Sequence, residues 1–243
     1  MIRAQRRFPA SSRSRSSCCV VVFLFIAFLA LLPASVAETQ DSSQLAPAST
    51  LSPTITFTLD FPESIPDHYT VTVNGDGHAA YDSTGKLTAE GDTPEPLHME
   101  FMMSAANRTK IFELARRAKY FAGKLDSDKR NLANTGTKTL TYHDEEHSTQ
   151  ASYNYSSSQP VQELTSLFQE ISVTLEFGRR LEYFHRYQKL ALDDELKRMD
   201  EMQRSNALEE VQAVGPILKK ISEDQSVING ARARALRLLQ ESR

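Results

Sequence analysis

The chain has 243 residues, of which 40% are hydrophobic, and 28 Lys and Arg against 31 Asp and Glu give a formal net charge of −3. These proportions are ordinary for a globular protein. Together with only two cysteines and nine glycines, they exclude a polytopic membrane protein, a disulfide scaffold and a collagen-like chain. The near balance of charge argues against a strongly basic nucleic-acid-binding protein.

The first 37 residues have the composition of a secretory signal peptide. Five arginines and no acidic residue precede an unbroken apolar run, Cys18–Leu32, which ends at Pro33. Ser35 and Ala37 then place small side chains before Glu38, as a cleavage site requires. We therefore expect a secreted or periplasmic protein that is cleaved after Ala37. The alternative is a retained anchor that tethers a periplasmic protein to the membrane, although the run of about 15 residues is shorter than the about 20 that span a bilayer.

Removal of residues 1–37 changes the chemistry of the chain. Both cysteines, Cys18 and Cys19, lie in this segment, so the expected mature protein has no thiol and no disulfide. It has 23 basic and 31 acidic residues, a net charge of −8. This composition excludes catalysis by a cysteine nucleophile and a metal site built on cysteine.

A linker and a series of strands follow the signal. Residues 38–53 are rich in Ser, Thr, Gln, Ala and Pro, which predicts a disordered linker. From Thr54 on, apolar and polar residues alternate, as in a strand with one buried face. The Asn-Gly and Asp-Gly steps of Asn74–Gly77 favour a tight hairpin turn. Strands are predicted at Thr54–Phe61, at Tyr69–Val73 and His78–Tyr81 on either side of this turn, and at Leu97–Met103.

Two helices and a second strand pair complete the first part of the chain. Ser104 is a typical helix cap, and apolar residues then recur at helical spacing as far as Gly123. Pro160 favours the start of a second helix. Strands are predicted at Thr137–Tyr142 and Thr149–Tyr155, around the turn His143–Ser148. Residues 54–177 therefore predict an α+β domain with a small, mostly antiparallel sheet in the order β-β-β-α-β-β-α.

The C-terminal segment, residues 178–243, predicts helices alone. A long helix is expected over Leu181–Met202, and Asn206 with Glu209 has the spacing of a capping box. A kink is expected at Gly215–Pro216, and the last helix, Val227–Leu239, should pair antiparallel with the one before it. Residues 38–178 have a net charge of −10 and residues 179–243 of +2. Opposite charges favour docking of the helices on the domain or on another molecule, and ordinary solvated surfaces are the alternative.

The hairpin carries a resemblance to known proteins. Tyr69–Tyr81 has the form Y-x-V-x-V-x-G-D-G-x-x-x-Y and precedes a helix ending in Ala118–Phe121, a strand pair and a closing helix. This arrangement resembles uncharacterised domains of exported bacterial proteins with a "GDG" hairpin, and it implies an α+β fold and export, without an activity. Leu208–Leu239 is similar to a single HEAT-type helix pair, although the chain has no second copy.

Two polar clusters are candidates for chemistry. His143–His147 contains two imidazoles and three carboxylates, which are groups that bind divalent cations. Its spacing is not that of H-E-x-x-H on a helix, so a polar hairpin turn is the simpler interpretation. Asn74–Gly77 has one carboxylate and lacks the ligands of a calcium loop. We assign no catalytic, cofactor-binding or metal-binding residue.

A third cluster mixes aromatic and basic residues on one predicted helix. Its aromatic members are Tyr183, Phe184, His185 and Tyr187, and its basic members are Arg179, Arg180 and Arg186. Such mixtures can bind nucleic acid, but export and the acidic net charge argue against it. We expect the aromatic rings to pack on the α+β domain while the arginines remain in solvent.

These observations favour an exported, non-enzymatic protein with a structural or protein-binding role. The C-terminal helices are the expected contact surface for a protein partner, and no cofactor is expected. One alternative is a hydrolase, metal-dependent or otherwise, with dispersed site residues, for which His143–His147 is the motivation. The other is the membrane-tethered protein described above.

Overall fold

The computed structural model describes residues 52–62, 64–87, 95–129 and 131–242. The predicted signal peptide and most of the predicted linker lie outside the described residues. All described residues belong to one unit, Ala48–Arg243.

The centre of the fold is a six-stranded sheet in which every pair of neighbouring strands is antiparallel. The strands are β1 (Thr54–Asp60), β2 (His68–Asn74), β3 (His78–Gly85), β4 (Glu95–Met102), β5 (Thr137–His143) and β6 (Ser148–Tyr153). Their order across the sheet is β4-β3-β2-β1-β5-β6. Side chains alternate along each strand, so that Ile55, Phe57 and Leu59 of β1 are buried while Thr56 and Thr58 face the other side.

The predicted fold class, an α+β protein with a helical C-terminus, is confirmed. Four strands precede the first helix, at the four ranges that the sequence predicts, and the order β-β-β-α-β-β-α is one strand short because it counts the two arms of the hairpin as one unit. Between them, Gly77 donates its N–H to the Asn74 carbonyl at 2.9 Å and has a φ of +99°. A left-handed backbone of this kind favours glycine at this position.

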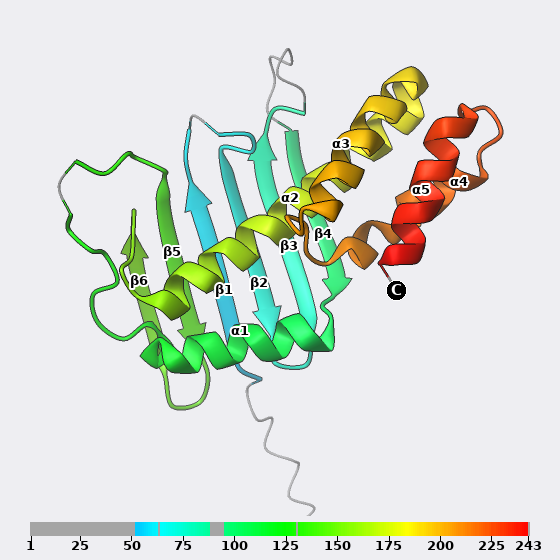
Figure 1. Cartoon of the computed structure of the whole chain (residues 1–243). Coiled ribbons are helices and arrows are strands. Elements are labelled where there is room, and N and C mark those ends of the chain that lie inside the picture. Colours follow the sequence, from blue (N-terminus) through cyan, green and yellow to red (C-terminus); the bar gives the residue numbers. More distant parts are fainter. Residues whose placement is uncertain (1–51, 63, 88–94, 130, 243) are drawn as a thin grey trace, which may run out of the picture. The chain divides into compact units, whose positions relative to one another are not determined.

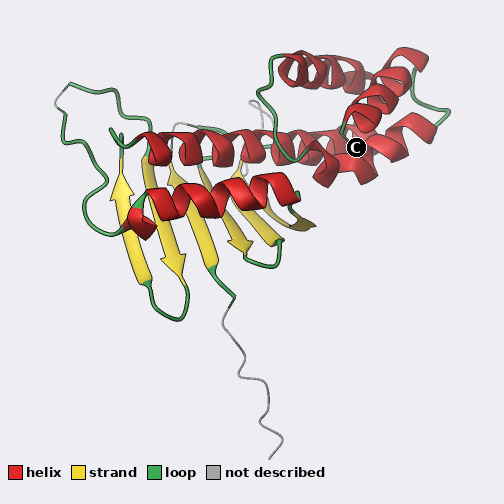
Figure 2. Cartoon of the chain, turned by 60° about the horizontal axis from the view of Figure 1, so that its bottom comes forward, coloured by secondary structure: helices red, strands yellow, loops and turns green. Residues whose placement is uncertain are grey.

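Two helices, α1 (Ala105–Arg117) and α2 (Gln159–Tyr187), lie side by side on one face of the sheet (Figures 1 and 2). Ser104 caps α1 as predicted, since its Oγ accepts the Asn107 N–H at 3.2 Å. The expected helix start at Pro160 is also confirmed. The ring of Phe168 in α2 stacks on Phe57 of the sheet at a centroid distance of 5.1 Å, and this contact joins the two layers.

The second helix is longer than the sequence predicts. It has 29 residues and runs through Gly178, so the predicted boundary between residues 177 and 178 lies inside it. The expectation of one helix over Leu181–Met202 is wrong, because α2 ends at Tyr187. A short 3-10 turn, η2 (Lys189–Ala191), then leads into α3 (Leu192–Arg204).

Three further elements complete the C-terminal segment: η3 (Val211–Val214), α4 (Gly215–Glu223) and α5 (Asn229–Glu241). The predicted capping box is wrong, since Asn206 and Glu210 both have left-handed backbone and the first helical turn begins only at Val211. A 3-10 turn that passes into α4 takes the place of the expected kink. The last two helices pack together as expected (Figure 1).

The C-terminal helices share the core of the sheet domain. One continuous set of buried apolar side chains extends from Ile55 in β1 to Leu238 in α5. Helix α2 contacts α1 and β2 along its first part and α3, η3 and α4 along its second. Among the described residues, no helix combines the length and the apolar character that a membrane span needs.

Gly178 permits this close packing, which leads to a first prediction. A Cβ atom at position 178 would lie 2.5 Å from Cγ1 of Val214, a distance that real contacts do not reach. Gly178→Ala is therefore expected to lower the free energy of unfolding by about 1–3 kcal/mol, although alanine favours a helix by about 1 kcal/mol over glycine. Urea denaturation followed by circular dichroism measures the change.

A compensating variant separates a steric cause from a general loss of stability. Val214→Ala makes room for the new methyl group, so Gly178→Ala/Val214→Ala should be more stable than the sum of the two single effects predicts. Simple additivity of the two substitutions, or a Gly178→Ala protein as stable as the wild type, would contradict the steric argument.

Candidate functional site

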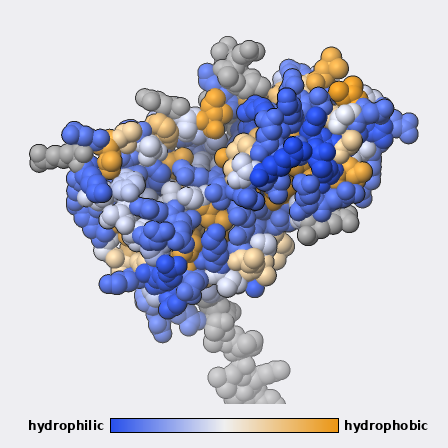
Figure 3. Space-filling model, in the orientation of Figure 1, coloured by the Kyte–Doolittle hydropathy of each residue, from blue (hydrophilic) through white to orange (hydrophobic). Residues whose placement is uncertain are grey.

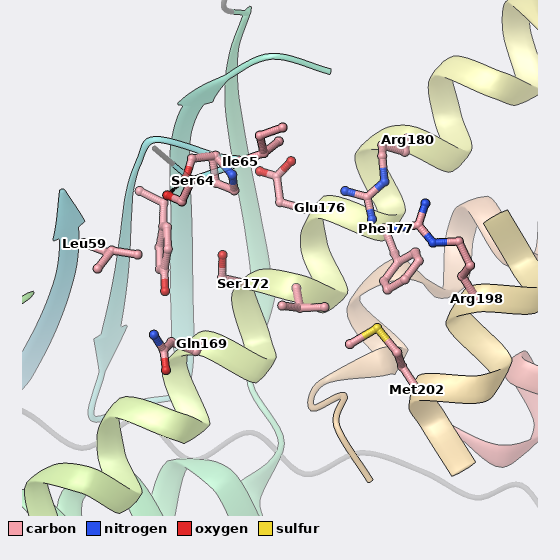
Figure 4. Close-up of a pocket in the computed structure, with 13 residues that line it drawn as sticks. Leu59, Ser64, Ile65, Gln169, Ser172, Glu176, Phe177, Arg180, Arg198 and Met202 are labelled. Atoms are coloured by element: carbon pink, nitrogen blue, oxygen red, sulfur yellow. Dashed lines mark hydrogen bonds between the residues drawn. The ribbon is translucent and has the colours of Figure 1, made fainter. Parts of the chain in front are cut away.

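A pocket of about 310 Å³ lies where the sheet domain meets the C-terminal helices (Figure 4). We call it the α2–α3 pocket. It is bounded by the end of β1, the β1–β2 loop, one side of α2, and α3. Its lining residues are Leu59, Ser64, Ile65, Pro66, Tyr69, Gln169, Ser172, Val173, Glu176, Phe177, Arg180, Arg198 and Met202.

The side chains that α2 contributes follow from helical geometry. Gln169, Ser172, Glu176 and Arg180 are three or four residues apart, so they lie on one side of the helix. The loop that precedes β2 lines the same pocket, and within it the Ser64 hydroxyl donates to the Phe61 carbonyl oxygen at 2.8 Å. One straight helix therefore supplies a polar row along the whole pocket.

A buried hydrogen-bond network forms the sheet side of the pocket. The Glu176 Oε1 atom accepts hydrogen bonds from the Ser83 hydroxyl at 2.6 Å and the Tyr81 hydroxyl at 3.0 Å. Ser172 Oγ lies 3.0 Å from the same Tyr81 oxygen. Burial, followed by the nearby Glu176 charge, raises the pKa of Tyr81 well above its usual value. Burial likewise raises the pKa of Tyr69, so both phenols remain protonated donors.

Arg179 provides the counter-charge for Glu176. The two side chains are only 6% and 5% exposed, and Arg179 NH1 lies 3.5 Å from Glu176 Oε2. Arg179 NH2 also donates to the Gly85 carbonyl at 3.3 Å, which joins α2 to the end of β3. The pair neutralises a charge that would otherwise be costly to bury.

Two arginines occupy the other end of the pocket. Arg180 Nε donates to Glu195 Oε1 at 2.6 Å, and Arg198 NH1 donates to Glu195 Oε2 at 3.1 Å. The Arg180 guanidinium also lies over the Phe177 ring, 4.7 Å from its centroid. Figure 4 shows both guanidinium groups together beside Phe177, with Met202 below the ring and Leu59 at the opposite end.

These positions correct one expectation. Arg179 is buried and Arg180 is largely covered, so the prediction that the arginines remain in solvent is wrong for this pair. They are covered because each has a buried glutamate as its partner. Among the aromatic residues, Phe184 packs against the core, whereas Tyr187 is 64% exposed.

The predicted cluster His143–His147 forms the β5–β6 hairpin turn. Asp144 Oδ1 accepts the backbone N–H groups of Glu146 and His147 at 2.8 and 2.6 Å, and Tyr142 donates its hydroxyl to Oδ2 at 2.8 Å. Desolvation raises the pKa of Asp144, but these hydrogen bonds outweigh it and hold the value at about 2. Asp144 is thus engaged in holding the turn.

The two histidines of this turn have different surroundings. His143 is exposed, whereas the His147 ring packs on Tyr120 at a centroid distance of 4.5 Å. In the part of the chain that the structure describes, no three His, Cys, Asp or Glu side chains group so as to hold a metal ion.

The face of the sheet opposite the helices is a second candidate site. In the register of the sheet, Thr56 lies between Thr72 and Thr141, and Thr58 lies between Thr70 and Thr139. We call this central set, with Ser152 beside Thr139, the hydroxyl face; its members are Thr56, Thr58, Thr70, Thr72, Thr139, Thr141 and Ser152.

Hydroxyl groups of neighbouring strands contact one another across this face. The Oγ1 atoms of Thr58 and Thr70 are 3.2 Å apart, and Thr139 Oγ1 lies 2.9 Å from Ser152 Oγ. At the described strand positions whose side chains point away from the helices, the sheet carries no lysine and no arginine. The hydroxyl face is thus polar and uncharged, while the carboxylates Asp60, Asp82 and Glu100 point to the same side of the sheet around it.

No protein-family model matches the chain, and no curated protein matches it in sequence.

Proposed function

We propose that the chain is an exported, non-enzymatic protein that acts by protein–protein association, and that its hydroxyl face binds a second copy of the same chain. The observation that carries the proposal is the uncharged row of threonines on three adjacent strands. A hydroxyl group both donates and accepts hydrogen bonds, so a surface of hydroxyls is complementary to itself. An isologous dimer requires a surface of this kind.

The size of the sheet fits this role. Six strands about 4.8 Å apart, each about seven residues long at about 3.4 Å per residue, give a flat projection on the order of 600 Å². Side-chain relief adds to the accessible area, which brings the face near the about 800 Å² that each partner buries in a standard interface. Long charged side chains would be costly to bury there, and the hydroxyl face itself has none, whereas Asp60, Asp82 and Glu100 lie around it on the same side of the sheet.

The buried carboxylates support a structural rather than a catalytic role. Glu176 joins α2 to β3, Glu210 joins η3 to the start of α1, and Asp200 joins α3 to Arg237 of α5 at 3.0 Å. Each of these acids makes the bonds that hold two elements together.

Self-association can be measured directly by sedimentation equilibrium. We expect the purified protein to form dimers at about 100 µM, an affinity suited to an interface that buries few large apolar groups. Thr56→Lys/Thr58→Lys places two charges on the central strand and should leave a folded monomer. Thr109→Lys, on the exposed side of α1, is the matched control and should dimerise as the wild type does. A wild-type monomer at this concentration, or dimers that persist in the double variant, would refute the proposal.

The C-terminal helices remain a second candidate surface for a protein partner. Tyr187 is 64% exposed, Leu190 83% and Ile228 47%. Lys189 Nζ lies 2.7 Å from Asp224 Oδ2. This ion pair brings Tyr187 and Leu190 beside the loop that contains Ile228. Figure 3 shows hydrophobic side chains near the upper right, where Figure 1 places the turn between α2 and α3.

Substitution tests this second surface better than deletion does, because residues 179–243 contribute to the shared core. Tyr187→Ser/Leu190→Ser should leave the fold intact and would abolish association if the helices form the contact.

Export has its own test: N-terminal sequencing of the exported protein should give Glu38 as the first residue, whereas an intact N-terminus would favour the retained anchor.

A further inference from the structure

The walls of the α2–α3 pocket combine apolar surface with two guanidinium groups at one end. Leu59, Val173, Phe177 and Met202 supply apolar surface. The guanidinium groups of Arg180 and Arg198 lie together at the Phe177 end, as Figure 4 shows. A ligand that satisfied both regions would have an apolar body and one polar end.

The charges of the pocket favour an anionic end. Among the lining residues, Arg180 and Arg198 carry two positive charges and Glu176 one negative charge, so the lining has one positive charge in excess. Glu195 engages Nε of Arg180 and NH1 of Arg198. This arrangement leaves the planar terminal amino groups of Arg180 to a carboxylate, which guanidinium binds in a two-pronged geometry.

We propose that the α2–α3 pocket binds a small amphipathic carboxylate, with its carboxylate at Arg180 and Arg198 and its apolar body against Phe177, Met202 and Val173. The volume sets the size of the ligand. A water molecule takes about 30 Å³ in the liquid, so about ten non-hydrogen atoms fill 310 Å³. A saturated chain of eight carbons with one carboxylate has this size. The site lies on the helix side of the sheet and is independent of the proposed association.

Isothermal titration of the purified protein with octanoate tests the proposal. We expect saturable binding of one octanoate per chain, no saturation with acetate, which lacks the apolar body, and none with octylamine, which has the opposite charge. Thr56→Lys/Thr58→Lys should bind octanoate as the wild type does, so loss of self-association and loss of this site can be told apart.

Variants of α3 locate the binding site. Arg198 is largely exposed, so Arg198→Gln should fold normally and weaken binding by about tenfold, the scale of one charge-assisted contact. Arg198→Glu should weaken it further. Met202→Trp should remove binding by filling the space beside Phe177. Arg204→Gln removes the same charge from the same helix, outside the pocket lining, and should leave the affinity unchanged.

Three results would overturn the proposal. These are the absence of saturable octanoate binding, equal binding of octylamine, or Arg198→Gln and Arg198→Glu proteins with wild-type affinity.

Discussion

Replacing Glu176 with alanine is expected to lower the free energy of unfolding by about 3–5 kcal/mol, the range for breaking a buried ion pair. The substitution removes the carboxylate that faces Arg179 and accepts hydrogen bonds from Tyr81 and Ser83. Arg179, Tyr81 and Ser83 then each lose one of their buried contacts, and each such loss is costly. Urea denaturation measures the change.

Three further variants identify the cause of this loss. Glu176→Gln keeps an acceptor oxygen and should cost about 1–2 kcal/mol. Glu182→Ala, on an exposed position of the same helix, should change stability by less than about 0.5 kcal/mol. Glu176→Leu/Arg179→Met removes both charges together and should recover much of the loss. If Glu176→Ala cost no more than Glu182→Ala, the network would have no part in stability.

Glu210→Ala should lower the free energy of unfolding by about 2–4 kcal/mol, because it removes several hydrogen bonds to one charged group. The Glu210 carboxylate accepts the backbone N–H of Ser104 at 2.9 Å, its hydroxyl at 2.7 Å, and the Asn107 amide at 2.7 Å. Its negative charge lies at the N-terminus of α1, where the helix dipole favours it. Thermal denaturation measures this loss.

The backbone at Glu210 allows a finer test. Its φ of +58° is left-handed, and glycine adopts that conformation at less cost than alanine. Glu210→Gly should therefore be less destabilising than Glu210→Ala by about 1 kcal/mol. Glu201→Ala, at an exposed position of α3, is the control and should leave the free energy of unfolding nearly unchanged. Equal stabilities for Glu210→Ala and Glu201→Ala would contradict the role of this carboxylate.

The sheet could be predicted because its signals are local. Alternation along β1 and β2, the turn at Asn74–Gly77 and the cap at Ser104 each involve residues close together in sequence. The continuity of α2 through Gly178 could not be predicted in this way. Glycine disfavours a helix by about 1 kcal/mol, and only the packing of Val214, which is distant in sequence, explains its position there.

The α2–α3 pocket could not be predicted from the sequence for a similar reason. Its lining runs from Leu59 to Met202 and combines a loop, a strand end and two helices, so no short motif marks it. The sequence carries only part of the evidence for this pocket, namely the polar residues that recur at helical spacing on α2. The sequence shows the adjacent pair Arg179 and Arg180. Their pairing with the buried carboxylates of Glu176 and Glu195 depends on the tertiary fold.

The continuity of α2 also determines how a ligand would enter. A helix that belongs to both halves of the core leaves no hinge between them, so the pocket cannot open by separation of two domains. Entry would instead depend on side-chain rotation at the rim, where Ile65 and Arg198 are both exposed. Such rotations take picoseconds to nanoseconds. Amide hydrogens in the middle of α2 should exchange only when the whole protein unfolds, and occupancy of the pocket should slow that exchange through mass action on the folded state.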